Sequence, residues 1–150
     1  MWVQSFEVHK AVTQARMLSG RYVTDQLSRH WTKNSSGLCS LPGCSGQDVG
    51  SLEHILLLCP ALSEARLRVI ELCRKVASES EELDTILKHV LDNQTKEVTM
   101  QFLLDCSNLP AVILSNHSKK HYIMQRLFYL TRTWCYSIHR IRMMCFAYIF

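Results

Sequence analysis

The sequence lacks most of the features that mark an enzyme, a membrane protein or a secreted protein. It has only five glycines and three prolines in 150 residues, and it contains no glycine-rich phosphate loop, no H-E-x-x-H motif and no Asp-Asp dipeptide. No run of 18 apolar residues is free of charge, so we expect no membrane span. Charged residues interrupt the first 20 positions, so we expect no signal peptide. The composition, 47% hydrophobic and 20% charged, is that of a folded globular chain.

Acidic residues are absent from one end of the chain. Residues 119–150 carry six Lys or Arg and no Asp or Glu, whereas residues 61–118 carry six and nine, and residues 1–60 carry five and four. The net charge of +4 is therefore concentrated in the last segment. This segment could face a polyanion, or its cations could simply solvate the outer side of a helix, and the sequence leaves both open.

The chain has seven cysteines, an odd number that does not suit a secreted disulfide framework. Without a signal peptide, we expect a reducing intracellular location, cytoplasmic and/or nuclear. In such a compartment, clustered Cys and His residues indicate metal ligands rather than disulfides.

Strand signals are weak throughout, so the predicted class is mainly α. We expect an N-terminal helical segment (1–34), an irregular zinc knuckle (35–62) and a helical C-terminal region (63–150). Residues 34–50 are rich in Ser, Gly, Asn and Pro and predict a loop. The predicted helices are Phe6–Leu18, a short helix capped by Thr24 and reaching about His30, 61–77, one starting at Ser80, Val98–Leu104 and a last helix of about 28 residues.

The last helix is predicted from one long apolar stripe. Its members recur at spacings of three and four, and they are Ile123, Leu127, Leu130, Trp134, Ile138, Ile141 and Cys145. The basic residues fall off this stripe: Arg126, Arg132, Arg140 and Arg142. A break is expected at 108–110, followed by a short apolar piece, Val112–Leu114.

Four residues have the spacing of a metal site. Cys39, Cys44, His54 and Cys59 form the pattern C-x4-C-x9-H-x4-C. Zinc favours four tetrahedral thiolate and imidazole ligands, and Cys3His is a common structural set. A turn at Pro42-Gly43 could present both sulfurs of the first pair. The sequence therefore predicts one structural zinc ion, with no position left open for a substrate.

The second pair needs an irregular backbone. His54 and Cys59 are five residues apart, which on an α-helix separates them by about 140°. The helix must therefore end or unwind near Cys59, where Pro60 favours a break. His30 is an alternative to His54 as the fourth ligand. The remaining cysteines are expected to be core or surface thiols.

Four segments together with the Cys39–Cys44 pair carry a family resemblance. They are Arg16–Tyr22 (RMLSGRY), Leu27–Trp31 (LSRHW), Gly50–Leu62 (GSLEHILLLCPAL) and Leu127–Arg140 (LFYLTRTWCYSIHR). With these segments the chain resembles the C-terminal zinc-knuckle tail of non-LTR (LINE-type) retrotransposon endonuclease/reverse transcriptase polyproteins. The resemblance covers most of the chain, and its most specific part is the His-x4-Cys-Pro segment with its upstream Cys pair.

The resemblance implies that the four metal residues are zinc ligands and that the module assists a polymerase in holding RNA or DNA. The paired catalytic aspartates of such a polymerase are missing here, as is the endonuclease, so we expect no catalytic activity. The alternatives are a structural scaffold that docks on the polymerase domain and a non-functional remnant of a retroelement.

Candidate nucleic-acid contacts are the basic residues near the knuckle and on the last helix, with one aromatic residue that could stack on a base. For that aromatic residue, Trp31, the competing interpretation is a hydrophobic anchor at the end of a short helix. The candidates are Arg16, Arg21, Arg29, Trp31, Lys33, Arg126, Arg132 and Arg140.

Overall fold

The computed structural model describes residues 2–33, 35–92, 95–108 and 120–147. Within these ranges the regular structure is helical, without strands, and Leu38 and Val49 form an isolated antiparallel bridge. The mainly α prediction, with an irregular Cys/His segment between helices and one long final helix, is confirmed. The predicted break at 108–110 and the piece Val112–Leu114 fall largely or wholly outside these ranges. No helix in the described part is long and apolar enough to span a membrane.

A long connecting segment, residues 29–53, separates the first two helices from the elements that follow. In chain order, the elements are α1 (Trp2–Leu18), α2 (Asp25–Ser28), the π-helical turn η1 (His54–Leu58), the 3₁₀ turn η2 (Pro60–Leu62), α3 (Ser63–Ala77), α4 (Glu81–Leu91), α5 (Lys96–Leu104), the 3₁₀ turn η3 (Cys106–Asn108) and α6 (Lys120–Ala147).

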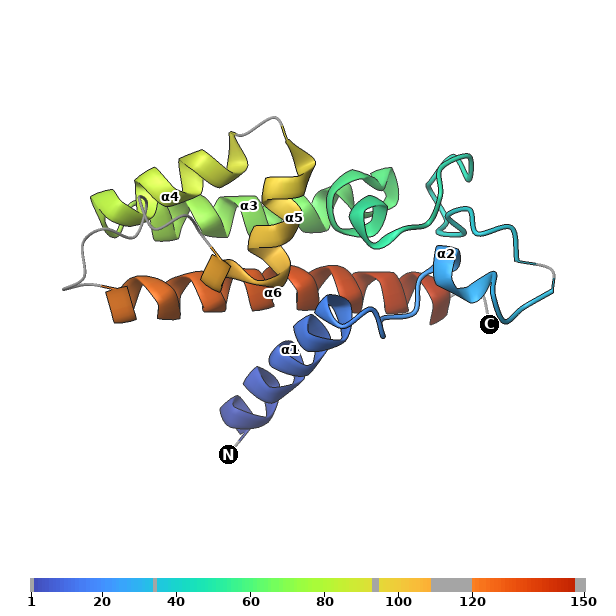
Figure 1. The fold of residues 1–150 in the computed structure, drawn as a ribbon, viewed down its shortest axis with the longest axis horizontal. Helices are drawn as coiled ribbons and strands as arrows, with labels where there is room; N and C mark the ends of the chain where they lie inside the picture. Colours follow the sequence, from blue (N-terminus) through green and yellow to red (C-terminus); the bar gives the residue numbers. More distant parts are fainter. Residues whose placement is uncertain (1, 34, 93–94, 109–119, 148–150) are drawn as a thin grey trace.

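The long helix α6 runs the length of the molecule and organises the others (Figure 1). Helix α3 runs antiparallel to it, α4 packs on α3, and α1 and α5 contact α6 as well. The predicted stripe faces this core, since its members from Ile123 to Ile138 are buried and Ile141 and Cys145 are half-buried. Burying such a stripe is the main source of stability for a helix in water.

Side-chain caps begin two of the helices, as predicted. The Thr24 hydroxyl accepts a hydrogen bond from the Leu27 N–H, and the Ser80 hydroxyl accepts one from the Leu83 N–H. Each cap satisfies a backbone donor that has no partner inside the helix. Helix α3 begins at Ser63 rather than at residue 61, because Pro60–Leu62 form a 3₁₀ turn first.

Helix α1 packs on the core through three buried polar side chains, Lys10, Thr13 and Gln14, as well as through the apolar Met17. It begins at Trp2, earlier than the predicted Phe6. Gln14 is buried and donates to the Leu103 carbonyl (2.7 Å) and to the Thr131 hydroxyl (3.0 Å), while Val8 and Val12 are exposed. The apolar periodicity of this segment therefore identifies the helix but not the face that it buries.

Arg142 does not lie on the solvated side of α6. It is 4% exposed, and it donates to the Val23 carbonyl (2.9 Å) and lies over the rings of Tyr22 and Phe146. The expectation that the arginines off the stripe could all solvate the outer side of the helix is wrong for this residue. The segment after α1 folds back across α6 and covers it, an arrangement that periodicity along one helix does not reveal.

Candidate metal centre

The first pair of candidate ligands lies on the irregular loop between α2 and η1, at the end of the molecule where α6 finishes (Figure 1). Backbone bonds close this loop: the Cys39 N–H donates to the Asp48 carbonyl (2.8 Å) and the Cys44 N–H to the Leu41 carbonyl (3.1 Å). Gly43 has a φ of +91°, a conformation that a side chain would strain. The predicted turn between the two cysteines is therefore formed, with glycine where it is needed.

His54 begins η1 and Cys59 directly follows its last residue, and the π-helical geometry of η1 explains how two residues five apart reach one site. The Cys59 N–H donates to the His54 carbonyl (2.6 Å), the i to i+5 bond that defines a π turn. This bond stacks Cys59 directly over His54, so the 140° separation of an α-helix does not arise. The helix ends at Cys59, which has the extended ψ of 121° that a residue before proline favours. The predicted break at Cys59 is confirmed, whereas the π turn was not foreseen.

The four candidate ligands converge on one point. Their ligand atoms all lie within 4.8 Å of one another. The Sγ atoms of Cys39 and Cys59 are 3.8 Å apart, and Cys44 Sγ lies 3.5 Å from His54 Nε2. A disulfide requires about 2.05 Å between sulfurs, so these thiols are not bonded to one another. The arrangement can hold a metal ion between four protein ligands.

His30, the alternative ligand, is exposed and does not belong to this group. It lines a separate small hollow beside α2, together with Tyr22 and Leu52. Three of the four converging residues are buried and Cys44 is half-buried, so the group is largely shielded from solvent. The structure thus brings His54, and not His30, to the cysteines.

The electrostatic surroundings differ among the three thiols. Burial raises the pKa of the Cys39 thiol to about 12 and also raises the pKa of Cys59. A hydrogen bond from the Gly46 N–H lowers the pKa of Cys44. A metal ion binds the thiolate form, so occupying this group would release protons from two buried thiols.

Arg66, in the first turn of α3, is a cation that contacts the backbone of one candidate ligand. Its guanidinium donates to the Cys59 carbonyl, and burial lowers the pKa of the guanidinium while the negative charge of Cys59 raises it. Three thiolates around a divalent ion would leave one net negative charge, which this guanidinium would offset. The sequence places Arg66 on the polar side of the predicted helix 61–77 and does not single it out among the Arg and Lys residues that could offset this charge. Its position seven residues after Cys59, in the first turn of the helix that follows Pro60–Leu62, is the signal that could have found it.

A carboxylate ties the metal-binding loop to α2. Asp25 accepts hydrogen bonds from the Ser40 N–H (3.2 Å) and the Ser40 hydroxyl (2.8 Å). Gly50 lies against the same side chain, and a Cβ at this position would stand 2.6 Å from Asp25 Cβ. The N-terminal segment and the loop are therefore held together by a contact that depends on glycine.

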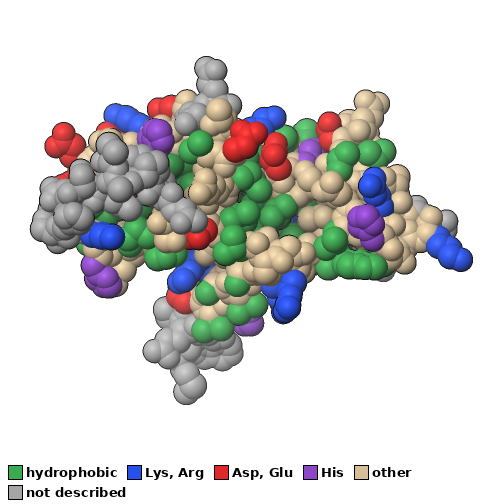
Figure 2. All heavy atoms as spheres, viewed as in Figure 1, with side chains coloured by type: hydrophobic (Ala, Val, Ile, Leu, Met, Phe, Trp, Pro, Cys, Tyr) green, Lys and Arg blue, Asp and Glu red, His purple; other side chains and the backbone are tan. Residues whose placement is uncertain are grey.

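Most of the candidate nucleic-acid residues are accessible. Trp31 is 67% exposed, so the interpretation of this residue as a hydrophobic anchor is wrong. Lys and Arg side chains are dispersed over the face shown in Figure 2, without a single basic patch. The exposed candidates are Arg16, Arg21, Arg29, Trp31, Lys33 and Arg140.

Two of the candidates on α6 are engaged within the protein. Arg126 forms a two-bond ion pair with Glu79, 2.8 and 3.0 Å, which lowers the pKa of that carboxyl. Arg132 lies over the Phe128 ring, 5.1 Å from its centre, and its Nε is buried without a hydrogen-bond partner. These two side chains are less available to a phosphate than the others.

Comparisons with protein families, with curated proteins and with solved structures found no match for this chain.

Proposed function

We propose that Cys39, Cys44, His54 and Cys59 bind one zinc ion. A tetrahedral zinc ion, with bonds of about 2.3 Å to sulfur and about 2.0 Å to nitrogen, separates two sulfurs by about 3.8 Å and a sulfur from a nitrogen by about 3.5 Å. These are the distances between Cys39 and Cys59 (3.8 Å) and between Cys44 and His54 (3.5 Å). This agreement is the observation that carries the proposal.

The zinc ion would be structural. Four protein ligands fill a tetrahedral shell and leave no position for water or substrate. The loop that the ion closes buries few side chains of its own, Cys39 and Leu41 among them. The ion would supply the stability that this loop lacks, and it would fix the N-terminal segment against the helical region.

We further propose that the protein is a catalytically inert C-terminal accessory module of a non-LTR retrotransposon reverse transcriptase, which assists the binding of RNA or DNA and adjoins the polymerase domain. The sequence resemblance described above is the basis of this proposal. The exposed cations and the exposed Trp31 on the segment beside the knuckle support it, because cations contact phosphates and an indole can stack on an unpaired base.

Zinc stoichiometry tests the metal site. We expect one zinc per chain in the wild-type protein and its loss in Cys44→Ser and in His54→Ala. A His30→Ala variant should keep its zinc. Zinc retained by His54→Ala but lost by His30→Ala would refute the assignment of His54.

Fluorescence anisotropy with labelled single-stranded RNA and DNA tests the nucleic-acid role. We expect affinity to fall steeply with salt, and Trp31→Ala to weaken binding by about 5- to 100-fold, the range for one stacked base. Arg29→Ala should reduce the salt dependence, whereas Lys75→Ala, an exposed change on α3, should not. Binding that is absent, or that does not depend on salt, would refute this role.

A further inference from the structure

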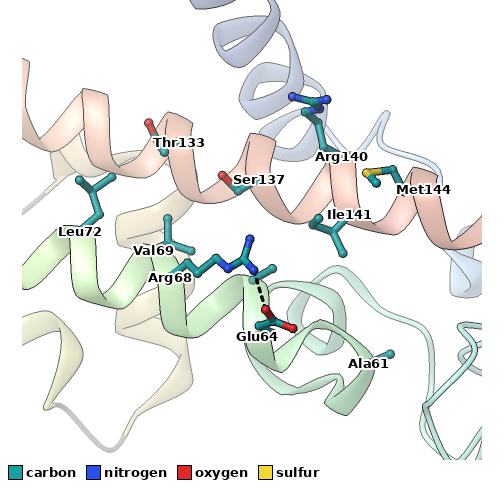
Figure 3. A pocket seen from close by; sticks show the side chains of 11 residues that line it. Ala61, Glu64, Arg68, Val69, Leu72, Thr133, Ser137, Arg140, Ile141 and Met144 are labelled. Atoms are coloured by element: carbon teal, nitrogen blue, oxygen red, sulfur yellow. Dashed lines mark hydrogen bonds and ion pairs between the residues drawn. The ribbon is translucent and has the colours of Figure 1, made fainter.

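A groove lies between α3 and α6, and none of the four candidate metal ligands lines it. It has a volume of about 550 Å³, and its side chains come from both helices (Figure 3). Apolar side chains make up most of its wall. The lining residues that matter here are Ala65, Val69, Leu72, Ser137, Ile141 and Met144.

The groove exists because small side chains lie between the larger ones. Ala61 of η2 and Ala65 of α3 line one side of it, and on α6, Thr133 and Ser137 line the other at a spacing of four. These side chains are too small to fill the space between the two antiparallel helices. The larger Val69, which also lines this space, is buried. Met144 is 47% exposed at one end of the groove. An apolar trench with accessible walls therefore remains.

The charge around the groove is basic. Arg68 and Arg140 line it from opposite helices (Figure 3). Arg68 pairs with Glu64 at 2.5 Å, but both side chains are more than 70% exposed, and such surface pairs contribute little and exchange readily. No acidic residue pairs with Arg140 in the described part of the chain, and α6 itself contains no Asp or Glu.

We propose that this groove binds an amphipathic helix of a partner protein whose apolar face is flanked by Asp or Glu. Two antiparallel helices with a trench between them accept a third helix, whose apolar residues at spacings of three and four insert into the trench. The two guanidinium groups would pair with carboxylates on the flanks of that helix, since Arg suits two-bond pairing with carboxylates.

The chemistry of the groove favours such a helix over a nucleic acid. Among the residues that the structure describes, no aromatic side chain lines the groove, so these residues offer an unpaired base no ring on which to stack. The groove is mainly aliphatic, and its charged lining residues are Arg68, Arg140 and Glu64. Such a lining suits an apolar ligand that carries a few negative charges. This proposal goes beyond the nucleic-acid role and uses none of the metal ligands.

A designed peptide provides the test. The probe is a fluorescein-labelled helical peptide of about 16 residues, with Leu at spacings of three and four and Glu on both flanks. Two controls have the same length: one carries Lys in place of Glu, and the other has the Leu positions scrambled. We expect the acidic peptide to bind zinc-loaded protein and to shift the Met144 methyl resonance, with both controls at least tenfold weaker.

Variants of the groove complete the test. Arg140→Glu should weaken the acidic peptide by about tenfold or more, because it places like charges together. Ser137→Phe should do so by filling the trench. Lys75→Glu, an exposed charge reversal on α3 outside the groove, should bind as the wild type does. Circular dichroism establishes that each variant is folded.

Several outcomes would overturn the proposal. One is equal binding of the acidic and the Lys-substituted peptides, and another is wild-type affinity in both Arg140→Glu and Ser137→Phe. A third is displacement of the acidic peptide by single-stranded RNA together with a shift of the Met144 methyl resonance by that RNA. Self-association that buries Met144 at the concentrations used would identify a second copy of the chain as the occupant.

Discussion

Removal of the zinc ion should unfold the knuckle loop and leave the helices in place. The 16 residues from 35 to 50 lose about 16 kcal/mol of backbone conformational entropy on ordering, at the low end of about 1 kcal/mol per residue. The buried Cys39 and Leu41 side chains return about 5 kcal/mol, and three backbone hydrogen bonds return about 3 kcal/mol. The loop is thus short of stability by about 8 kcal/mol, close to the ~10 kcal/mol that a structural zinc ion supplies.

The helical region does not share this deficit. Leu56, Leu87 and Leu127 belong to one buried core, and Trp134 Nε1 donates to the Leu56 carbonyl at 3.3 Å. The same core includes Cys39 and Leu41 of the loop, but most of its members lie on helices that pack on one another, so chelation should not dissolve it.

Hydrogen–deuterium exchange before and after chelation measures the effect residue by residue. We expect the amides of Cys39, Cys44 and Gly50 to lose protection on chelation, while the amides of α3 and α6 keep theirs. Cys145→Ser, which changes a half-buried cysteine outside the metal site, is the matched control and should behave as the wild type. Retained protection at Cys39 and Gly50 would refute the reasoning, as would unfolding of α6 together with the loop.

Three further predictions concern residues around the site and the core. Arg66→Met should lower zinc affinity by about 10- to 100-fold in competition with a chelator, because the Cys59 carbonyl loses its donor and the site its nearby cation. Gly50→Ala should lower the free energy of unfolding in urea by about 1–3 kcal/mol, because the new Cβ collides with Asp25. Burial, and then the nearby arginines, lower the pKa of His139. The unfolded chain therefore binds a proton more readily at this residue than the folded chain does, so the free energy of unfolding should rise with pH up to about 6.5. His139→Gln should flatten this dependence in urea titrations between about pH 5 and 7.

A specific experimental result would contradict each of these three predictions. Arg68→Met is an exposed change on the same helix as Arg66, and equal zinc affinities of the two variants would exclude a role for the buried guanidinium. Gly20→Ala meets no neighbour and should cost only about 1 kcal/mol for its positive φ, so a larger loss there than at Gly50 would contradict the collision. An unchanged pH profile in His139→Gln would assign the acid sensitivity to other groups.

The sequence alone was sufficient for features that depend on neighbours along the chain. The stripe from Ile123 to Cys145 determined the long final helix, because burial at spacings of three and four repeats the helical turn. The caps Thr24 and Ser80 followed from side chains that accept from nearby backbone donors. The four converging Cys and His residues were also identified from their spacing, since a metal site needs a fixed number of ligands of known type.

The structure alone decided the irregular local backbone between His54 and Arg66 and the contacts between segments distant in sequence. The π turn at His54–Leu58 aligned two ligands that an α-helix would have separated, and its 3₁₀ continuation through Pro60 brought Arg66 to the Cys59 carbonyl. Arg142 became buried because the residues after α1 return to cover α6. Periodicity describes one helix at a time, so it identifies an apolar face but not the segment that packs against it, and it cannot reveal a groove that small residues on two helices leave between them.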